Sequence, residues 1–207
     1  MPSLINCRNC IIANDVQSHT VSKSRLSLKW QDECNSNERI RQIVESFRQT
    51  DGSYLLSRRD ILLCEDSFEK VTKALWWGYP NGMRVHFHEV VQYFDGMANI
   101  LQPFRNQILD AHSFDDLYNN LNLQYVGPAT ISKLLYFFNI YQGDTQCVIV
   151  DRFVRESMKY YDEFHTVHEN QPSRWYLEHA RQINEVNIAG ATPEQIEFFL
   201  FSFRVNH

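Results

Sequence analysis

Residues 123–154 carry the clearest structural signal in the chain, LQYVGPATISKLLYFFNIYQGDTQCVIVDRFV. Pro128 predicts the start of a helix, because proline presets the helical φ angle and its missing N–H costs nothing in the first turn. The apolar run that follows extends this helix to about Tyr141. Residues 147–150 form a short apolar run, and Asp151 can cap a further helix. The segment therefore predicts two helices, the first entered through a tight hairpin and the second through an acidic residue.

The rest of the chain also favours helices. Apolar residues recur at three- and four-residue spacing, and Asn37 and Thr192 stand where helix caps are expected. The predicted helices cover about residues 38–48, 58–75, 87–101, a short stretch from 104, 113–121, 151–161, 172–186 and 192–205. Residues 1–35 are polar and predict an irregular N-terminal arm with one short strand at 26–30. We predict an all-α fold in which residues 36–207 form the functional domain.

Composition limits the classes of partner. Of the 207 residues, 43% are hydrophobic, which suffices for a buried core, but no apolar run approaches the ~20 residues of a membrane span. The five cysteines cannot all pair within the chain, which favours reduced thiols and a cytoplasmic location. Cys7 and Cys10 have zinc-like spacing without a second pair of ligands, so no metal site is predicted. With a net charge of −5, a nucleic-acid site is expected only as a local basic face.

Gly127 and Pro128 form a candidate phosphate-binding turn. We expect Gly127 to adopt a positive φ angle or to let a ligand approach the backbone closely. The free N–H groups after Pro128 carry the positive end of the helix dipole, which attracts a phosphate without a basic side chain. Most Gly-Pro helix starts are only turns, so this feature depends on its neighbours for a functional meaning.

The hairpin at 123–135 and the segment VIVDRFV at 148–154 together resemble the helix-hairpin-helix DNA glycosylases. The segments WGYPNGMR at 77–84, KLLYF at 133–137 and TPEQIEFFLF at 192–201 are similar to the 8-oxoguanine-glycosylase-like (OGG-fold) branch, and the likeness covers roughly residues 38–205. The resemblance implies two helical lobes with a cleft between them that binds double-stranded DNA. No cysteine follows Cys147, so the iron–sulfur loop of some members is absent and no cofactor is implied.

The resemblance implies a catalytic role for Asp151. A carboxylate close to the sugar stabilises the positive charge that develops as an N-glycosidic bond breaks, or orients the attacking water. The simpler alternative is a helix cap, and one residue can do both. Lyase members carry a lysine where this chain has Ala129, but Lys133 follows one turn later, could reach back, and could form a Schiff base. Ala129 favours a monofunctional enzyme that uses water, with Lys133 assisting by charge and lyase activity as the alternative.

Further residues are candidates for contact with DNA or with an extruded base. The hairpin candidates for DNA binding are Tyr125, Val126, Gly127, Ala129 and Thr130, with Tyr125 at the position of a second family glycine. The basic candidates are Arg84, Arg152 and Arg155, and one of the last two is expected to face solvent in a salt bridge. Because the target base must leave the stack, aromatic residues are expected around it. The base-pocket candidates are Trp77, Tyr79, Phe137 and Phe199, although most aromatic residues of helices lie in the core.

We therefore predict a monomeric DNA glycosylase that flips out a modified base and hydrolyses its N-glycosidic bond, leaving an abasic site. The base is an oxidised purine, or a bulky modified pyrimidine as in anti-phage defence. Two alternatives stay open. A helix-hairpin-helix module that binds DNA without catalysis is supported by Ala129, and a helical interaction protein without a nucleic-acid role is supported by the acidic net charge.

Overall fold

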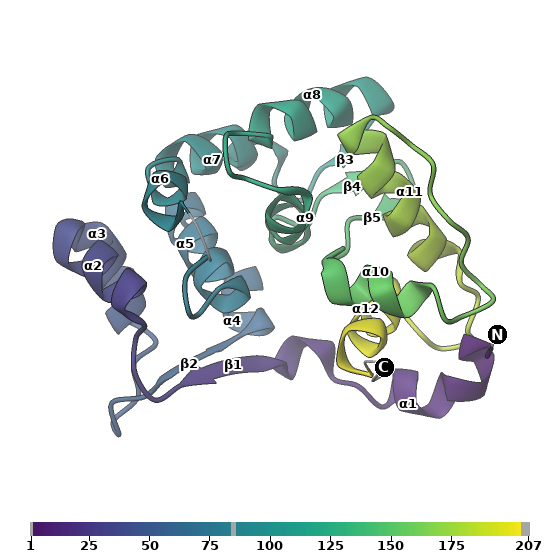
Figure 1. The fold of residues 1–207 in the computed structure, drawn as a ribbon, viewed down its shortest axis with the longest axis horizontal. Coiled ribbons are helices and arrows are strands. Elements are labelled where there is room, and N and C mark those ends of the chain that lie inside the picture. The colour runs from purple at the N-terminus through teal and green to yellow at the C-terminus, as the bar shows by residue number, and fades with distance from the viewer. Residues whose placement is uncertain (1, 84–85, 204–207) are drawn as a thin grey trace.

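Helices joined by short loops make up most of the molecule, with two small β-sheets (Figure 1). The computed structural model describes residues 2–83 and 86–203. Its α-helices are α1 Arg8–Ile12, α2 Leu28–Ser36, α3 Glu38–Glu45, α4 Arg58–Leu62, α5 Ser67–Gly78, α6 Phe87–Val91, α7 Phe94–Leu101, α8 Ala111–Leu121, α9 Pro128–Phe137, α10 Arg152–Met158, α11 Pro172–Glu185 and α12 Pro193–Ser202. Short 3₁₀ helices cover Leu4–Cys7 (η1), Val16–Ser18 (η2) and Gln102–Phe104 (η3). The all-α prediction is correct for most of the chain but misses the sheets.

The two sheets join segments that are distant in sequence. The first pairs β1 Thr20–Lys23 with β2 Tyr54–Ser57 in antiparallel register. The second contains β3 Ile108–Leu109, β4 Tyr141–Gln142 and β5 Thr145–Gln146, with β3 and β4 parallel. The strand predicted at 26–30 is wrong, because Ser27 accepts a hydrogen bond from the Trp30 N–H and caps α2 there.

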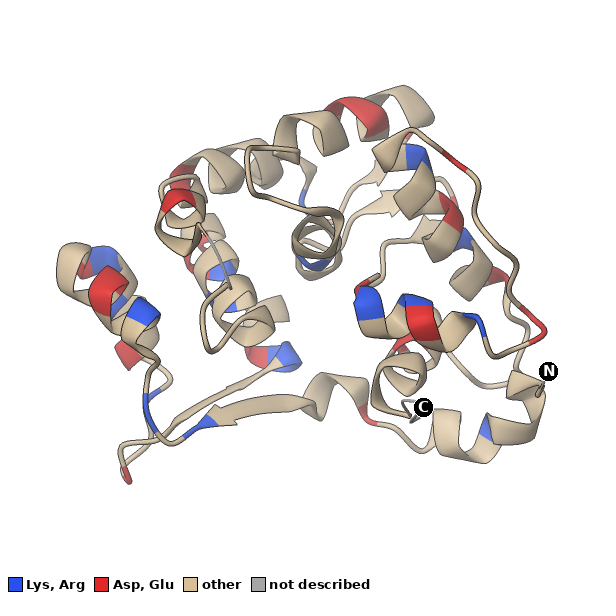
Figure 2. Cartoon of the chain, in the orientation of Figure 1, with Lys and Arg blue, Asp and Glu red and all other residues tan. Residues whose placement is uncertain are grey.

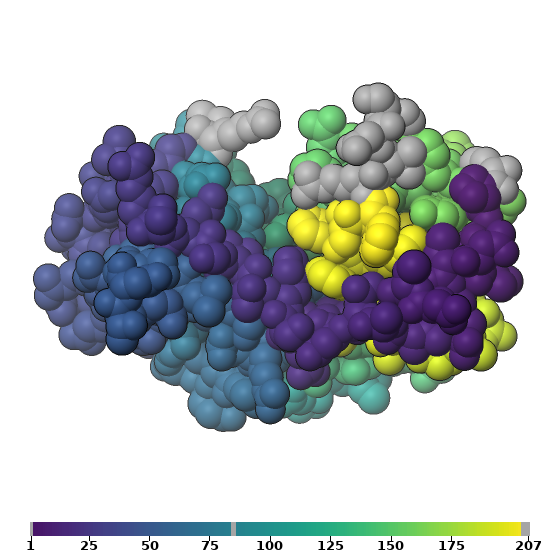
Figure 3. Space-filling model, turned by 90° about the horizontal axis from the view of Figure 1, so that it is seen from below, coloured from purple at the N-terminus to yellow at the C-terminus, as the bar shows by residue number. Residues whose placement is uncertain are grey.

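The first 35 residues, expected to be irregular, contain η1, α1, η2, β1 and most of α2. Leu4 and Ile11 are fully buried, and α1 packs against α12. The beginning of the chain therefore lies beside its end, as the purple and yellow segments of Figures 1 and 3 show. Burial of these apolar residues gives the N-terminal segment a fixed place in the core.

Two of the long predicted helices are each divided into two shorter helices. The range 58–75 splits into α4 and α5, because the Asp66 carboxylate accepts a hydrogen bond from the Glu69 N–H and starts a new helix. The range 87–101 splits into α6 and α7. The helix predicted from 113 begins at 111, because Asp110 caps it. The short helix predicted from 104 is wrong, since this part of the chain leads into β3.

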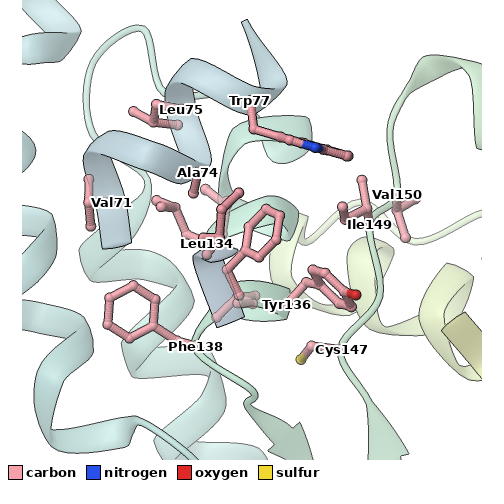
Figure 4. Close-up of a cluster of buried hydrophobic side chains, with 14 of the residues drawn as sticks. Val71, Ala74, Leu75, Trp77, Leu134, Tyr136, Phe138, Cys147, Ile149 and Val150 are labelled. Atoms are coloured by element: carbon pink, nitrogen blue, oxygen red, sulfur yellow. The ribbon is translucent and has the colours of Figure 1, made fainter. Parts of the chain in front are cut away.

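Helix α9 occupies the centre of the fold and is seen end-on in Figure 1. Every residue from Thr130 to Phe137 is buried, as expected for a helix that is covered on all sides. The helix contacts α4, α5 and α11, and Figure 4 shows Leu134 facing Ala74 of α5. Each large apolar side chain buried here stabilises the fold by about 1.5–3 kcal/mol. The position of α9, and of any functional group on it, is therefore strongly held.

The C-terminus of α9 comes earlier than predicted, at Phe137 rather than near Tyr141. Asn139 adopts a positive φ of 55°, and the Ile140 N–H donates to the Leu135 carbonyl at 3.1 Å. This is a Schellman motif, in which a left-handed residue satisfies the last carbonyls of a helix. The chain then passes through β4 and β5 into residues 147–150, which are buried as predicted.

Candidate active site

Lys133 and Asp151 line one cavity of about 190 Å³. His19, Arg58, Trp77 and Glu197 also line it, so six separate parts of the chain meet there. Figure 4 shows Trp77 at the end of α5 and, across from it, the segment that leads to Asp151. The fold therefore brings the two predicted catalytic residues together in a pocket with an aromatic wall.

Lys133 reaches back toward the start of α9. Its side chain is only 5% exposed, and its Nζ atom donates a hydrogen bond to the Ala129 carbonyl at 3.2 Å. The same Nζ atom lies 5.2 Å from the centre of the Tyr79 ring. Gly78 makes room for the lysine stem, because a Cβ atom there would lie 2.7 Å from Lys133 Cδ. The expectation that Lys133 reaches the helix mouth is confirmed.

Asp151 caps α10, as one of its two interpretations predicted. Its Oδ1 atom accepts hydrogen bonds from the N–H groups of Phe153 at 2.9 Å and Val154 at 3.1 Å. Both bonds use Oδ1, so Oδ2 stays outside the cap while the residue lines the cavity. Capping therefore leaves one carboxylate oxygen for a second role.

Ser132 connects the two halves of the site. Its fully buried Oγ atom donates to the Ala129 carbonyl at 3.0 Å and accepts a hydrogen bond from the Val150 N–H at 3.2 Å. These bonds join the first turn of α9, on which Lys133 rests, to the residue before Asp151. Because buried hydrogen bonds are costly to leave unmade, this link maintains the spacing of the two candidate residues.

A buried ion pair between Arg58 and Glu197 forms part of the cavity lining. Arg58 is 1% exposed and Glu197 is fully buried, and two hydrogen bonds of 2.7 and 3.2 Å join the guanidinium to the carboxylate. Burial raises the pKa of Glu197, an effect that the charge of Arg58 opposes. The pair joins α4 to α12, and the guanidinium lies 5.1 Å from the centre of the Trp77 ring. Such a bidentate pair fixes the cavity wall geometrically.

His19 lines the same cavity from the N-terminal segment. Its ring lies 5.2 Å from that of Trp77 and 4.7 Å from that of Phe198. Burial and the nearby positive charge of Arg58 lower the pKa of His19 to about 4. The imidazole is therefore neutral near pH 7.

A second cavity, of about 640 Å³, borders the first. Tyr79 and Val150 line the larger cavity, and the residues next to them in the chain, Gly78 and Asp151, line the smaller one. Hairpin residues line one side, and Arg155 and Trp175 line another. In Figure 3 the surface is hollowed between the teal segment near α6 and the green segment near α10. The larger cavity thus opens beside the pocket that holds Lys133 and Asp151.

The hairpin differs from the sequence prediction in its backbone. Gly127 has an ordinary φ of −85°, and the positive φ of 67° falls on Tyr125. A left-handed conformation costs a non-glycine residue roughly 1–2 kcal/mol. The Tyr125 ring, 44% exposed, stacks on the ring of His86 with 3.7 Å between centroids, and His86 also has a positive φ of 56°. Around Gly127 itself a Cβ atom would meet open space, so a ligand has access to this backbone.

The predicted DNA contacts lie in different surroundings. Of the five hairpin candidates, all but Val126 line the larger cavity, whereas Val126 is 2% exposed and packs in the core. Arg155 lines the cavity and lies 5.1 Å above the Trp175 ring. Arg152 forms an exposed ion pair with Glu156, which confirms that one of these two arginines faces solvent. Arg84 lies outside the described residues.

The four base-pocket candidates separate into two pairs. Trp77 lines the smaller cavity and Tyr79 the larger one. Phe137 is fully buried behind Trp77, with 5.6 Å between the ring centres, and Phe199 packs against Tyr161. Neither phenylalanine lines either cavity, because their helices turn these positions toward the core. They are structural residues here, contrary to their assignment from the sequence.

Sequence reasoning missed His19, Arg58 and Glu197. No local motif joins these positions, which are far apart in the chain. One signal was available, because Glu197 lies in the apolar run IEFFLF, and a buried acid requires a partner. The identity of that partner depends on how α4 and α12 pack.

Along the described part of the chain, Lys and Arg alternate with Asp and Glu on the helices, as the blue and red segments of Figure 2 show. Lys133 and Arg155 contribute positive charge to the walls of the cavities, while Arg58 is neutralised by Glu197. Within residues 2–83 and 86–203, no group of three or more His, Cys, Asp or Glu side chains is arranged to hold a metal ion. No helix in that part of the chain has the length and apolar character needed to cross a bilayer.

A protein-family model matches residues 14–201 of the chain. The matching family is described as "Putative 8-oxoguanine DNA glycosylase OGG-like protein". Searches among curated proteins and among solved structures gave no significant match. The match covers both cavities and all of the residues discussed above that line them.

Proposed function

The chain belongs to this OGG-like glycosylase family, and on that basis we propose that it excises a modified base from double-stranded DNA. One observation carries the proposal beyond family membership, namely that Lys133 and Asp151 line the same cavity. An extruded base could enter this cavity, because Trp77, Phe153 and Phe201 in its lining offer stacking surfaces. The base is an oxidised purine or a bulky modified pyrimidine, such as those found in phage DNA.

Asp151 is proposed to stabilise the developing charge on the sugar. As the bond between C1′ and the base nitrogen lengthens, positive charge grows on the deoxyribose. A carboxylate that already faces the cavity interacts with this charge in surroundings of low dielectric constant. Because Oδ1 is held by two backbone N–H groups, the side chain does not need to reorganise during the reaction.

Lys133 is the proposed nucleophile, a change from the water-using route that the sequence favoured. That preference depended on Ala129, which stands where lyase members of the family carry a lysine. The Lys133 amine, however, lies 3.2 Å from the Ala129 carbonyl and so reaches back to that position of the helix. After the ammonium group loses a proton to water, its lone pair attacks C1′ and forms a C–N bond while the bond from C1′ to the base breaks; the base leaves with that electron pair and takes up a proton. Opening of the sugar ring then gives a Schiff base, which water hydrolyses or which undergoes elimination of the 3′ phosphate.

The larger cavity is the proposed path of the DNA backbone next to the reaction site. Backbone N–H groups at the start of α9 and the guanidinium of Arg155 border it, and both attract phosphate. The exposed Tyr125 ring stands at its edge, where it can stack on a base beside the extruded nucleotide. These features allow an acidic protein to bind DNA through a small number of local contacts.

Incubation with synthetic duplexes tests the proposal. Each duplex carries one modified base, the panel includes oxidised purines and hypermodified cytosines, and hot alkali reveals abasic sites. We expect excision from at least one duplex and its loss in Asp151→Asn, which keeps the cap because asparagine caps helices about as well as aspartate. Asp110→Asn is the matched control, since Asp110 caps α8 outside both cavities.

Borohydride trapping separates the two chemical routes. The lysine route predicts a covalent protein–DNA adduct with the wild-type protein and none with Lys133→Met. Lys70→Met is the control, because Lys70 is also buried and bonded to carbonyl groups but lines neither cavity. Excision without an adduct would restore the water-using route. Binding of DNA without excision across the whole panel would support a non-catalytic binding module, and no binding at all would contradict both.

A further inference from the structure

A third cavity, of about 320 Å³, lies beside the larger one, and we call it the basic cavity. It lies between α10, α11 and the connection that joins them. Its polar lining consists of Arg155, Lys159, His165, Thr166 and His179. None of the described residues that line it is acidic, whereas Asp151 lines the smaller cavity and Glu169 the larger one. This lining favours an anionic ligand.

Arg155 and Trp175 line both the basic cavity and the larger one, so the two spaces share this part of their walls. The Arg155 guanidinium lies 5.1 Å from the centre of the Trp175 ring. His179 holds the tryptophan in turn, since its ring lies 4.3 Å away and its Nδ1 atom donates to the Trp175 carbonyl at 2.8 Å. The arginine is therefore ordered by contact with a ring rather than by an acid.

The terminal nitrogens of Arg155 stay available to a ligand. Only its Nε atom is closed off by protein, and none of its nitrogens donates a hydrogen bond within the described part of the chain. Contact with an indole ring leaves the N–H groups of a guanidinium free to bind an anion in a planar, paired arrangement. The Nη atoms therefore reach space from which an anion can approach.

Lys159 follows Arg155 by one turn, at the end of α10. Neither residue forms a salt bridge within residues 2–83 and 86–203. Glu156, which lies between them in the sequence, is bonded instead to Arg152 at 2.7 Å. Because like charges four residues apart on a helix repel each other, an anion that contacts both side chains is stabilised.

The two histidines of the basic cavity contribute no net charge. The Nε2 atom of His165 lies 3.1 Å from the Glu178 carboxylate, which balances a proton on that ring. Burial lowers the pKa of His179, which keeps this ring neutral near pH 7. The charge that the cavity offers to an anion is therefore that of Arg155 and Lys159.

We propose that the basic cavity binds a backbone phosphate of the DNA through Arg155 and Lys159. The inference rests on the proposed function and adds to it the course of the strand, which runs from the hairpin through the larger cavity and past the Arg155–Trp175 pair that borders both. Phosphate fits this lining, because the guanidinium provides paired N–H donors, Lys159 a point charge and Thr166 a hydroxyl donor. Contacts of this kind carry no sequence information, so they hold any duplex in the same way.

The salt dependence of DNA binding tests this site without any excision. On duplex DNA each phosphate contact contributes about 0.9 to the magnitude of the slope of log K against log salt concentration. We therefore expect Lys159→Gln to make this slope shallower by about 0.9 and to weaken binding of an unmodified duplex about eightfold at about 0.1 M salt, since ten to the power 0.9 is about eight. The loss should be the same for duplexes of different sequence. Lys159 is exposed, so the substitution leaves the core intact.

Two variants serve as controls. Lys159→Arg keeps the positive charge and should keep the wild-type slope. Arg59→Gln changes the net charge of the protein by the same amount as Lys159→Gln, but Arg59 is exposed on α4 and lines none of the three cavities. It should leave both the slope and the affinity unchanged.

The measured slopes separate this site from the proposed excision. A wild-type slope in Lys159→Gln would overturn the phosphate site whether or not the protein excises a base. An equal loss of slope in Arg59→Gln would also overturn it, because the effect would then come from net charge alone. A shallower slope in Lys159→Gln only, in a protein that excises nothing, would support the site and remove the glycosylase. Saturable binding of inorganic phosphate that depends on Lys159, followed by ³¹P NMR, together with a wild-type DNA slope in Lys159→Gln, would assign the cavity to free phosphate and overturn its role in DNA binding.

Discussion

Gly78→Ala is the substitution that tests the site geometry most directly. Gly78 ends α5 and touches the stem of Lys133, so a methyl group there acts on the lysine without changing any predicted catalytic atom. A Cβ atom would lie 2.7 Å from Lys133 Cδ and 2.8 Å from Cε, whereas ordinary contacts begin at 3.4 Å. The lysine stem must therefore move by about 0.7 Å, the difference between 3.4 and 2.7 Å.

This displacement should reduce activity far more than stability. A misplacement of about 1 Å can cost about 100-fold in rate, so we expect Gly78→Ala to lower the yield of borohydride-trapped adduct and the excision rate by about 10- to 100-fold. The free energy of unfolding should change by no more than about 1 kcal/mol, because alanine favours the helix by about 0.5–1 kcal/mol and the flexible lysine can yield. The two effects are measured by single-turnover excision and by urea denaturation.

Gly96→Ala is the control for helix propensity. Gly96 lies in α7, is exposed, and would place its Cβ atom where no other heavy atom lies within 4 Å. This variant should gain stability and retain full activity. Wild-type excision by Gly78→Ala would refute the view that the position of the Lys133 amine controls the reaction. A loss of activity in parallel with a large loss of stability would instead indicate general misfolding.

Three further predictions follow from the surroundings of the site. Glu197→Ala should lower the free energy of unfolding, measured by urea denaturation, by about 3–5 kcal/mol, because it leaves Arg58 charged and buried without a partner. The double variant Arg58→Met/Glu197→Leu should lose less stability. Equal losses in the two variants would show that the unpaired charge is unimportant. Thermal stability should fall as the pH drops from about 6.5 toward 4, because His19 is protonated near pH 6.5 in the unfolded chain but only near pH 4 in the folded protein. The His19→Phe variant should lose less stability over this interval. An identical dependence of stability on pH in the two proteins would contradict the buried neutral ring. Tyr125→Gly should leave stability within about 1 kcal/mol, because relief of backbone strain offsets the lost ring stacking, but should weaken binding to a duplex with an abasic-site analogue about tenfold; unchanged affinity in a filter-binding assay would remove Tyr125 from the DNA interface.

Local rules account for much of the helical structure. Pro128, Asn37 and Thr192 mark helix starts whose signals lie within four residues, and each of those helices begins where the signal stands. The same locality explains the errors, because Asp66 and Asp110 are equally good caps that compete with apolar runs for the helix boundary. Where two local signals conflict, only packing decides between them.

The sequence also identified Lys133 and Asp151 as candidates, together with the cap at Asp151. Their proximity required the turn after α9, the buried run at 147–150 and the Ser132 hydrogen bond to Val150, which no spacing rule contains. Backbone torsion was also misjudged, since the positive φ expected at Gly127 falls on Tyr125. Stacking against a distant histidine offsets the strain, and such a contact is invisible along the chain.

From the order of its residues alone, the chain is predicted to be mostly helical, to resemble the helix-hairpin-helix DNA glycosylases, and to carry Lys133 and Asp151 on two successive helices. The residues that surround Lys133 and Asp151 in the cavity were decided by tertiary packing. Residues 19, 58, 77 and 197 line one cavity because α4 and α5 pack on α9 while α12 packs on α10 and η2, and the energy that holds them there comes from burial summed over the whole core. Interactions within a few residues are recorded in the local sequence, whereas a cavity depends on contacts between positions that only the folded chain brings together.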